Sequence, residues 1–157
     1  MNRARKITEI LGANFQHIQL NDTNYDGYYT WDTTIGGEDY KFSADTIEAN
    51  DRGGYSATID FTRHVFGNQW TITQTPTDPK DAIRVFSAAV AFVKALMHKL
   101  GWLVHITFSA NVHEQSRVLA YKKLAEIISH RTGGRVETRQ DGYSMQFSID
   151  HMKQVQF

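Results

Sequence analysis

The chain contains no cysteine, only two prolines, and no excess of charge of either sign. The absence of cysteine excludes disulfides, thiolate catalysis and thiolate zinc sites, and it fits a reducing compartment. The 17 basic and 17 acidic side chains balance, so no global field draws the protein to nucleic acid or to an anionic membrane. The N-terminal stretch MNRARKITEILGANF has no apolar run long enough for a signal peptide or a membrane span. We therefore expect a cytoplasmic protein without membrane contact.

The 157 residues are enough to bury a core, and 41% of them are hydrophobic. We find no internal repeat, no low-complexity tract and no long linker, so we expect a single domain over residues 1–157. The two prolines, Pro76 and Pro79, stand close together at the middle of the chain. They mark the one abrupt change in the spacing of apolar residues.

Before the prolines, apolar and polar residues mostly alternate, as they do in strands with one buried face. A first helix is expected near residues 4–11, and a strand near residues 15–20. Further strands are predicted around residues 29–35, 40–44, 55–61 and 70–72, with Gly36-Gly37 as a two-residue hairpin turn. An antiparallel meander is the simplest interpretation.

Beyond the prolines, apolar residues recur every three or four positions. This spacing predicts one helix over about residues 82–100, ended by Gly101, and another over residues 118–128, ended by Gly133-Gly134. A strand at 104–108 separates the two helices, and residues 135–149 form a last hairpin. Asn111 and Glu114 have the spacing of a capping box for the second helix.

The predicted fold class is therefore α+β, with a mixed, mainly antiparallel sheet and helices packed on its faces. A helix that connects two strands usually makes a right-handed crossover between parallel strands. We accordingly expect the strand at 102–109 to lie parallel to the strand at 70–73.

The stretch FSANVHEQSRVLAYKKL, residues 108–124, resembles the strand-to-helix segment of GNAT-type N-acetyltransferases. In that family a meander precedes a strand, a cofactor loop and a long helix, and a tyrosine in the following helix commonly serves as general acid. Asn111 matches the polar residue of the turn, and Tyr121 matches the tyrosine. The resemblance implies a GNAT-like fold and, for an enzyme, acetyl-CoA as cofactor with Tyr121 as the catalytic residue.

The same region, together with the preceding DAIRVFSAAVAFV, is similar to small proteins encoded by tailed bacteriophages. Their shared pattern resembles D-A-x-R-V-F…F-S-A…S-R…Y. The matching residues are Asp81, Ala82, Arg84, Val85, Phe86, Phe108, Ser109, Ala110, Ser116, Arg117 and Tyr121. This similarity implies a phage-encoded protein, located in the host cytoplasm or in the virion, and it implies no particular activity.

The segment that would hold coenzyme A departs from the GNAT pattern. The family has a run like R-G-x-G-x-A/G, whose glycines let backbone N–H groups approach the pyrophosphate at a helix N-terminus. Here TPTDPKDAIRV stands at that place, and no glycine occurs from Asn68 to Leu100. Pro79 removes a donor, while Asp78 and Asp81 complement the helix dipole in place of a bound anion. We therefore expect no cofactor in the usual mode.

A polar cluster near the two predicted helix starts supplies the candidate binding residues Arg84, Asn111, Ser116 and Arg117. Two arginines beside a tyrosine suit bidentate binding of a phosphate or a carboxylate. The structural alternative pairs Arg117 with Asp81 across the helix starts and packs the ring of Tyr121 inward. The sequence leaves both interpretations open.

Other chemistry has weaker support in the sequence. The triplet His105-Ile106-Thr107 is the half-motif of 2H phosphoesterases, but that chemistry needs two such triplets, and the best second candidate, residues 17–19, lacks the hydroxyl. His113-Glu114 begins no H-E-x-x-H motif because Arg117 stands where the second histidine belongs. We therefore expect no metal site.

The first strands carry many aromatic residues but few interleaved basic ones, so binding to nucleic acid is not expected. A sheet face packed on a helix explains these aromatics better; they are Tyr25, Tyr28, Tyr29, Trp31, Tyr40 and Phe42. The preferred hypothesis is a GNAT-like accessory protein of phage type that binds a macromolecular partner, either a host protein it inhibits or a virion component. A divergent acetyl-CoA-dependent N-acyltransferase is the alternative, and a 2H-type phosphoesterase is a distant third.

Overall fold

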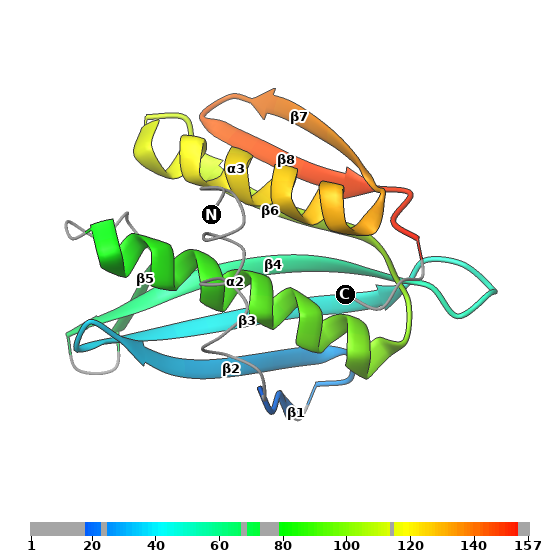
Figure 1. Cartoon of the computed structure of the whole chain (residues 1–157), viewed down its shortest axis with the longest axis horizontal. Helices are drawn as coiled ribbons and strands as arrows, with labels where there is room; N and C mark the ends of the chain where they lie inside the picture. The colour runs from blue at the N-terminus through cyan, green and yellow to red at the C-terminus, as the bar shows by residue number, and fades with distance from the viewer. Residues whose placement is uncertain (1–17, 23–24, 67–68, 73–78, 114, 154–157) are drawn as a thin grey trace, which may run out of the picture.

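The computed structural model describes residues 18–22, 25–66, 69–72, 79–113 and 115–153 (Figure 1). Within them, eight strands form one mixed sheet that is covered by two helices. The elements are β1 (Asn21–Asp22), β2 (Tyr28–Ile35), β3 (Glu38–Glu48), β4 (Tyr55–Phe66), β5 (Gln69–Ile72), α2 (Pro79–Leu100), β6 (Leu103–Asn111), α3 (Gln115–Thr132), β7 (Arg135–Asp141) and β8 (Ser144–Asp150). The predicted α+β class and the predicted order of meander, helix, strand, helix and hairpin are confirmed. The predicted helix at residues 4–11 lies outside the described residues.

The meander formed by β2, β3 and β4 follows the alternation of the sequence. β2 and β3 join through Gly36 and Gly37, which both have positive φ (61° and 79°), as the tight hairpin turn requires. Trp31 of β2 lies opposite Phe42 of β3, and Phe42 lies opposite Phe61 of β4, so the three rings share one face of the sheet. The predicted antiparallel meander is confirmed.

The prediction that the strand at 102–109 lies parallel to the strand at 70–73 is wrong. β6 runs parallel to β4, with Ala57 opposite Ile106, whereas β5 is antiparallel to β4. The reason is the length of β4, whose 12 residues offer one edge to two neighbours. β6 pairs with the first part of that edge, and β5 folds back as a short hairpin onto the last part. The strand that precedes the α2 crossover is thus not the strand beside β6.

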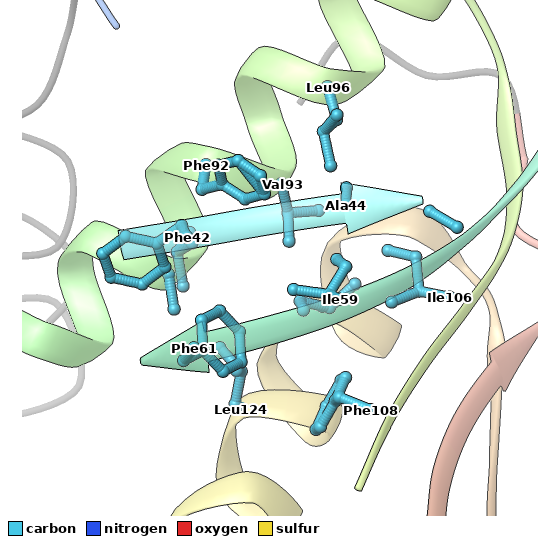
Figure 2. Packing of buried hydrophobic residues seen from close by; sticks show 14 of the residues in the cluster. Phe42, Ala44, Ile59, Phe61, Phe92, Val93, Leu96, Ile106, Phe108 and Leu124 are labelled. Carbon is cyan, nitrogen blue, oxygen red and sulfur yellow. The ribbon is translucent and has the colours of Figure 1, made fainter. Parts of the chain in front are cut away.

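Both helices cover the same face of the sheet. The ring of Phe92 on α2 packs on Phe42 with centroids 5.8 Å apart, and Tyr121 on α3 packs on Phe61 at 5.7 Å. Figure 2 shows the α2 side chains over β3 and β4, with Phe108 of β6 nearer to α3. This one core explains four of the six aromatic residues of the first strands, namely Tyr29, Trp31, Tyr40 and Phe42, whereas Tyr25 is exposed and Tyr28 is not part of the core.

The opposite face of the sheet, here called the outer face, is polar over β6 and β8. Register places three polar pairs on it: Thr107 with Ser148, Ser109 with Gln146, and Asn111 with Ser144. The intervening pairs are apolar and point to the helices. This strict alternation fixes the register, because a slip of one residue would bury the polar set.

Glycines end both helices as predicted. Gly101 follows α2 and Gly133 follows α3, each with positive φ (84° and 71°) and each donating its N–H to a carbonyl four residues earlier. The predicted capping role of Asn111, however, is wrong. Asn111 is the last residue of β6, and its Oδ1 accepts the N–H of His113 at 2.9 Å, whereas α3 begins at Gln115. An asparagine readily bonds the backbone two residues ahead, and here that contact shapes the loop instead of capping the helix.

Candidate functional site

The candidate site lies at one end of the sheet, where β6 ends and α3 begins. Figure 1 shows that α2 also starts at this end, and that the turn between β7 and β8 is there as well. The start of α3 and the β7–β8 turn therefore lie near the last residues of β6. The backbone joins two of them directly, because the N–H of Val112 donates to the carbonyl of Tyr143 at 2.8 Å.

A pocket of about 460 Å³ opens at this end. Its lining residues are Ser109, Ala110, Asn111, Arg117, Asp141, Tyr143 and Ser144. Ala110 and Arg117 are buried and form its base, whereas the other five are exposed and form its rim. Two of the predicted binding residues, Asn111 and Arg117, are thus brought together in one pocket.

Arg117 lies in the first turn of α3 and is only 3% exposed. Its guanidinium carbon lies 5.9 Å from the centre of the Tyr121 ring, within cation–π range, four residues ahead on the same helix face. A buried cation requires such compensation, since transfer from water is costly. The expected pairing with Asp81 stays a prediction, because the side chains of Asp81 and Ser116 lie outside the described residues. Arg84 is exposed on α2 and does not line the pocket.

Tyr121 is built into the core. It is 9% exposed, and its ring meets Phe108 edge-on at 5.4 Å and an interplanar angle of 88°. Phe61 and Phe147 flank the same ring at 5.7 and 6.4 Å. These edge-to-face contacts are favourable packing geometry for aromatic rings. The ring therefore has a structural role, and the role of its hydroxyl as a general acid stays a prediction.

The parallel strands β4 and β6 separate towards this end of the sheet. Their pairing stops at Thr58 and Thr107, and from Thr62 to Phe66 the same edge of β4 is paired with β5. A crevice beside diverging parallel strands is a common place for a ligand, and an extended ligand would bond to the strand edge. Here β5 already occupies the backbone groups of the β4 edge over that interval.

A second polar arrangement lies on the outer face. Asp150 Oδ1 is 3.3 Å from Nδ1 of His105, whose Nε2 is 2.7 Å from Oγ1 of Thr107. Thr107 Oγ1 in turn lies 3.5 Å from the hydroxyl of Ser148. The order carboxylate, imidazole, hydroxyl is that of an activated nucleophile. Thr107 is only 9% exposed and does not line the pocket, so the arrangement is a network that ties β6 to β8.

The sequence analysis placed His105 correctly on the polar side of its strand, next to Thr107. It missed Asp150 and Ser148 because they come from β8, and only the register of β6 against β8 brings them close. The second half-motif proposed for a 2H phosphoesterase, at residues 17–19, is not wholly within the described residues.

We expect the Asp150 contacts to stabilise the fold only above about pH 4. Burial acts to raise the pKa of Asp150, but hydrogen bonds from the N–H of His151 and from His105 outweigh it and hold the pKa below the ordinary value of 3.8. A carboxylate with a lowered pKa stabilises the folded state above its unfolded pKa, and this stabilisation is lost as pH falls through the folded value. Because the side chain is 45% exposed, the effect is at most about 1 kcal/mol.

The measurement is urea unfolding of the wild type and Asp150→Asn from pH 7 to pH 2. The variant should be less stable at neutral pH, and the difference should shrink below about pH 4. A difference that stays constant to pH 2 would contradict this account of Asp150.

The rim of the pocket was not foreseen from the sequence. Asp141, Tyr143 and Ser144 belong to the β7–β8 hairpin, which was predicted as structure without a binding role. A signal was present in the tyrosine directly after Asp141-Gly142, since a large aromatic beside a tight turn has no strand partner to bury it. Tyr143 is indeed 72% exposed.

Within the described ranges, no group of three or more His, Cys, Asp or Glu side chains is arranged to hold a metal ion. Over the same residues, no helix combines the length and the apolar character needed to cross a bilayer.

Comparison with known proteins does not assign the chain to a family. No protein-family model matches it, and no curated protein matches it. Among solved structures, it is similar to an acetyltransferase of the GNAT family from Streptococcus pneumoniae. The two share 12% sequence identity over 82% of this chain and 69% of that chain, with a TM-score of 0.45. A similarity of this size says nothing about cofactor or reaction.

Proposed function

We propose that this chain is a GNAT-like accessory protein that acts by binding a macromolecular partner, in keeping with its resemblance to small phage proteins. The partner is a protein, either a host protein that the chain inhibits or a component of the virion. One observation carries the proposal: two large apolar side chains are exposed near the starts of the two helices, at the end of the molecule that also holds the pocket.

These side chains are Ile83 on α2 and Leu119 on α3, with exposed fractions of 43% and 67%. Both helices lie on one face of the sheet and begin at the same end (Figure 1). We infer that both side chains contact the same partner, because exposed apolar side chains that lie in one region are typical of protein interaction sites. We call Ile83 and Leu119 the helix-start patch.

Exposed basic side chains lie near both residues of this patch, and the exposed Glu126 also lies on the same side of α3 as Leu119. Arg84 is exposed next to Ile83, and Lys122 and Lys123 are exposed three and four residues after Leu119, on the same side of α3. An apolar centre with a charged rim is the usual anatomy of a protein interface. The partner that fits has apolar side chains bordered by acidic ones, because opposite charges steer association.

Affinity capture with matched variants tests the proposal. Tagged wild-type chain, Leu119→Glu and Ile47→Glu are compared in lysate of the host, and the captured protein is then purified and bound directly. Ile47 is the matched control because it is also 67% exposed but lies near the C-terminal end of β3 and not on either helix. A partner retained by the wild type and Ile47→Glu but lost by Leu119→Glu supports the proposal. Equal retention by all three contradicts it.

The divergent N-acyltransferase remains the second candidate, and one observation favours it. Tyr121, which the GNAT resemblance selects as general acid, lies beside Arg117, and Arg117 lines the pocket. Against it stand the composition of the segment before α2 and the occupation of the β4 edge by β5. Both features remove backbone groups that the cofactor would use.

We expect acetyl-CoA to leave the melting temperature unchanged. A ligand present at a hundred times its dissociation constant would stabilise the folded state by about 2.7 kcal/mol, which is readily seen as a shift. Thermal unfolding with and without millimolar acetyl-CoA checks this. A clear upward shift, together with turnover that Tyr121→Phe abolishes without loss of binding, would establish the enzyme instead.

A further inference from the structure

We propose that the pocket at the end of β6 is a carbohydrate-binding site, with Tyr143 as the stacking platform for a sugar ring. This inference goes beyond the proposed function, because it gives a ligand class to the pocket, which is distinct from the helix-start patch. It is carried by three features of the pocket: its mixture of hydrogen-bonding groups, its balance of charge, and an exposed aromatic ring held in place at its rim.

Most hydrogen-bonding side chains at the rim are available to a ligand, as far as the described residues show. The hydroxyls of Ser109 and Ser144 and the carboxylate of Asp141 make no side-chain hydrogen bond or ion pair to other described residues. Asn111 uses its Oδ1 for the N–H of His113, which fixes the amide and leaves its Nδ2 directed elsewhere. Together the rim offers donors, acceptors and groups that do both.

This mixture selects among ligand classes. A free phosphate or carboxylate presents mainly acceptors, and the two charges of the lining act on it in opposite directions. The guanidinium of Arg117 at the base would attract it and the carboxylate of Asp141 at the rim would repel it, so the charge of the pocket does not select an anion. A purely apolar ligand would strip water from Asp141 and the serines without replacing their hydrogen bonds, which is costly. A neutral polyhydroxylated ligand avoids both penalties, since each of its hydroxyls donates and accepts. The pocket volume of about 460 Å³ falls within the range of small-ligand sites.

Tyr143 supplies the apolar contact that a sugar ring also needs. It is 72% exposed, yet its position is fixed, because its carbonyl accepts the N–H of Val112 and its ring lies 5.4 Å from the His113 imidazole. A tyrosine gives a large, rigid and amphipathic surface at low cost in conformational entropy. The C–H groups on one face of a pyranose pack on such a ring while its hydroxyls reach the polar rim.

The outer face continues the polar surface away from the pocket. Beyond Ser109 the same face carries Gln146 and Ser148 of β8, which are both partly exposed. These side chains share one face with the pocket rim, so further sugar units of an oligosaccharide would meet hydroxyl and amide groups there. The site therefore suits an oligosaccharide better than a single sugar.

The experiment uses the full chain with glucose-, galactose- and N-acetylglucosamine-terminated oligosaccharides as probes. Amide chemical shifts are followed by NMR, and affinities are measured for wild type, Tyr143→Ala and Tyr25→Ala. Tyr25 is the matched control because it is 77% exposed and lies outside the pocket, between β1 and β2. We expect shifts at Ser109, Asn111 and Ser144, and at least about tenfold weaker binding for Tyr143→Ala alone.

Three results would overturn the inference. The first is that no saccharide of the panel binds, and the second is that binding survives Tyr143→Ala unchanged. The third is that inorganic phosphate or acetate perturbs the same amides at lower concentration than any saccharide. The helix-start variants keep the proposals separate: partner capture that depends on Leu119, without saccharide binding, rejects only the carbohydrate site. If the wild-type chain neither captures a partner nor binds a saccharide, both the proposed function and the carbohydrate site are rejected.

Discussion

Replacing Tyr121 by alanine is expected to lower the free energy of unfolding by about 3 kcal/mol. Its ring is almost fully buried and meets the rings of Phe61 and Phe108 edge-on. Truncation removes the apolar area and leaves a cavity between β4, β6 and α3 that the surrounding rings fill only in part. The cation–π contact with Arg117 is lost at the same time, which leaves a buried guanidinium less well compensated.

Tyr121→Phe separates the packing role of the ring from any role of its hydroxyl. Phenylalanine keeps the ring contacts, so Tyr121→Phe should retain most of the stability that Tyr121→Ala loses. Urea unfolding of the two variants beside Tyr25→Ala, a truncation of an exposed tyrosine, provides the measurement. A midpoint for Tyr121→Ala equal to that of the wild type would contradict the structural role of this ring.

Leu119→Glu is expected to weaken binding of the purified partner by at least about thirtyfold, with an unchanged melting temperature. Loss of an interface anchor typically costs about 2 kcal/mol or more, and the new carboxylate faces the acidic rim we infer for the partner. Glutamate is a good helix former, so α3 itself should be unaffected at this exposed position. Titration by calorimetry gives the change in affinity.

The salt dependence of the same complex tests the basic rim. Raising the salt concentration should slow association of the wild type, because screening weakens the attraction between Lys122, Lys123 and the acidic partner. Ile47→Glu should bind as the wild type does at every salt concentration. Binding by Leu119→Glu at wild-type strength would contradict the placement of the interface on α3.

Most of the secondary structure followed from local pattern, and the physical reason is visible in single elements. Alternation placed Trp31 and Phe42 on one face, and two glycines with positive φ closed the hairpin between them. Three- and four-residue spacing gave both helices, and Gly101 and Gly133 ended them. These signals are local because a strand face or a helix stripe is set by the direction of successive side chains.

Local pattern could not predict which strands lie side by side in the sheet. The crossover prediction assumed that the last strand before α2 lies beside the first strand after it, but β5 is a short return hairpin on the edge of β4. Nothing in the sequence of residues 69–72 distinguishes an added hairpin from a full member of the meander. The position of β5 depends on how β5 and β6 share the edge of the long strand β4, and this sharing is a property of the assembled sheet.

The sequence by itself determined the fold class, the helix ends and a cluster of candidate residues at the β6–α3 junction, because periodicity and turn chemistry act over a few residues. Only the tertiary structure decided which of those candidate residues lie in the pocket, on the surface or in the core. Arg117 and Asn111 line one pocket with Tyr143, Arg84 lies apart on the surface, and the Tyr121 ring belongs to the core. Burial and proximity depend on strand register and helix placement, which no local pattern encodes.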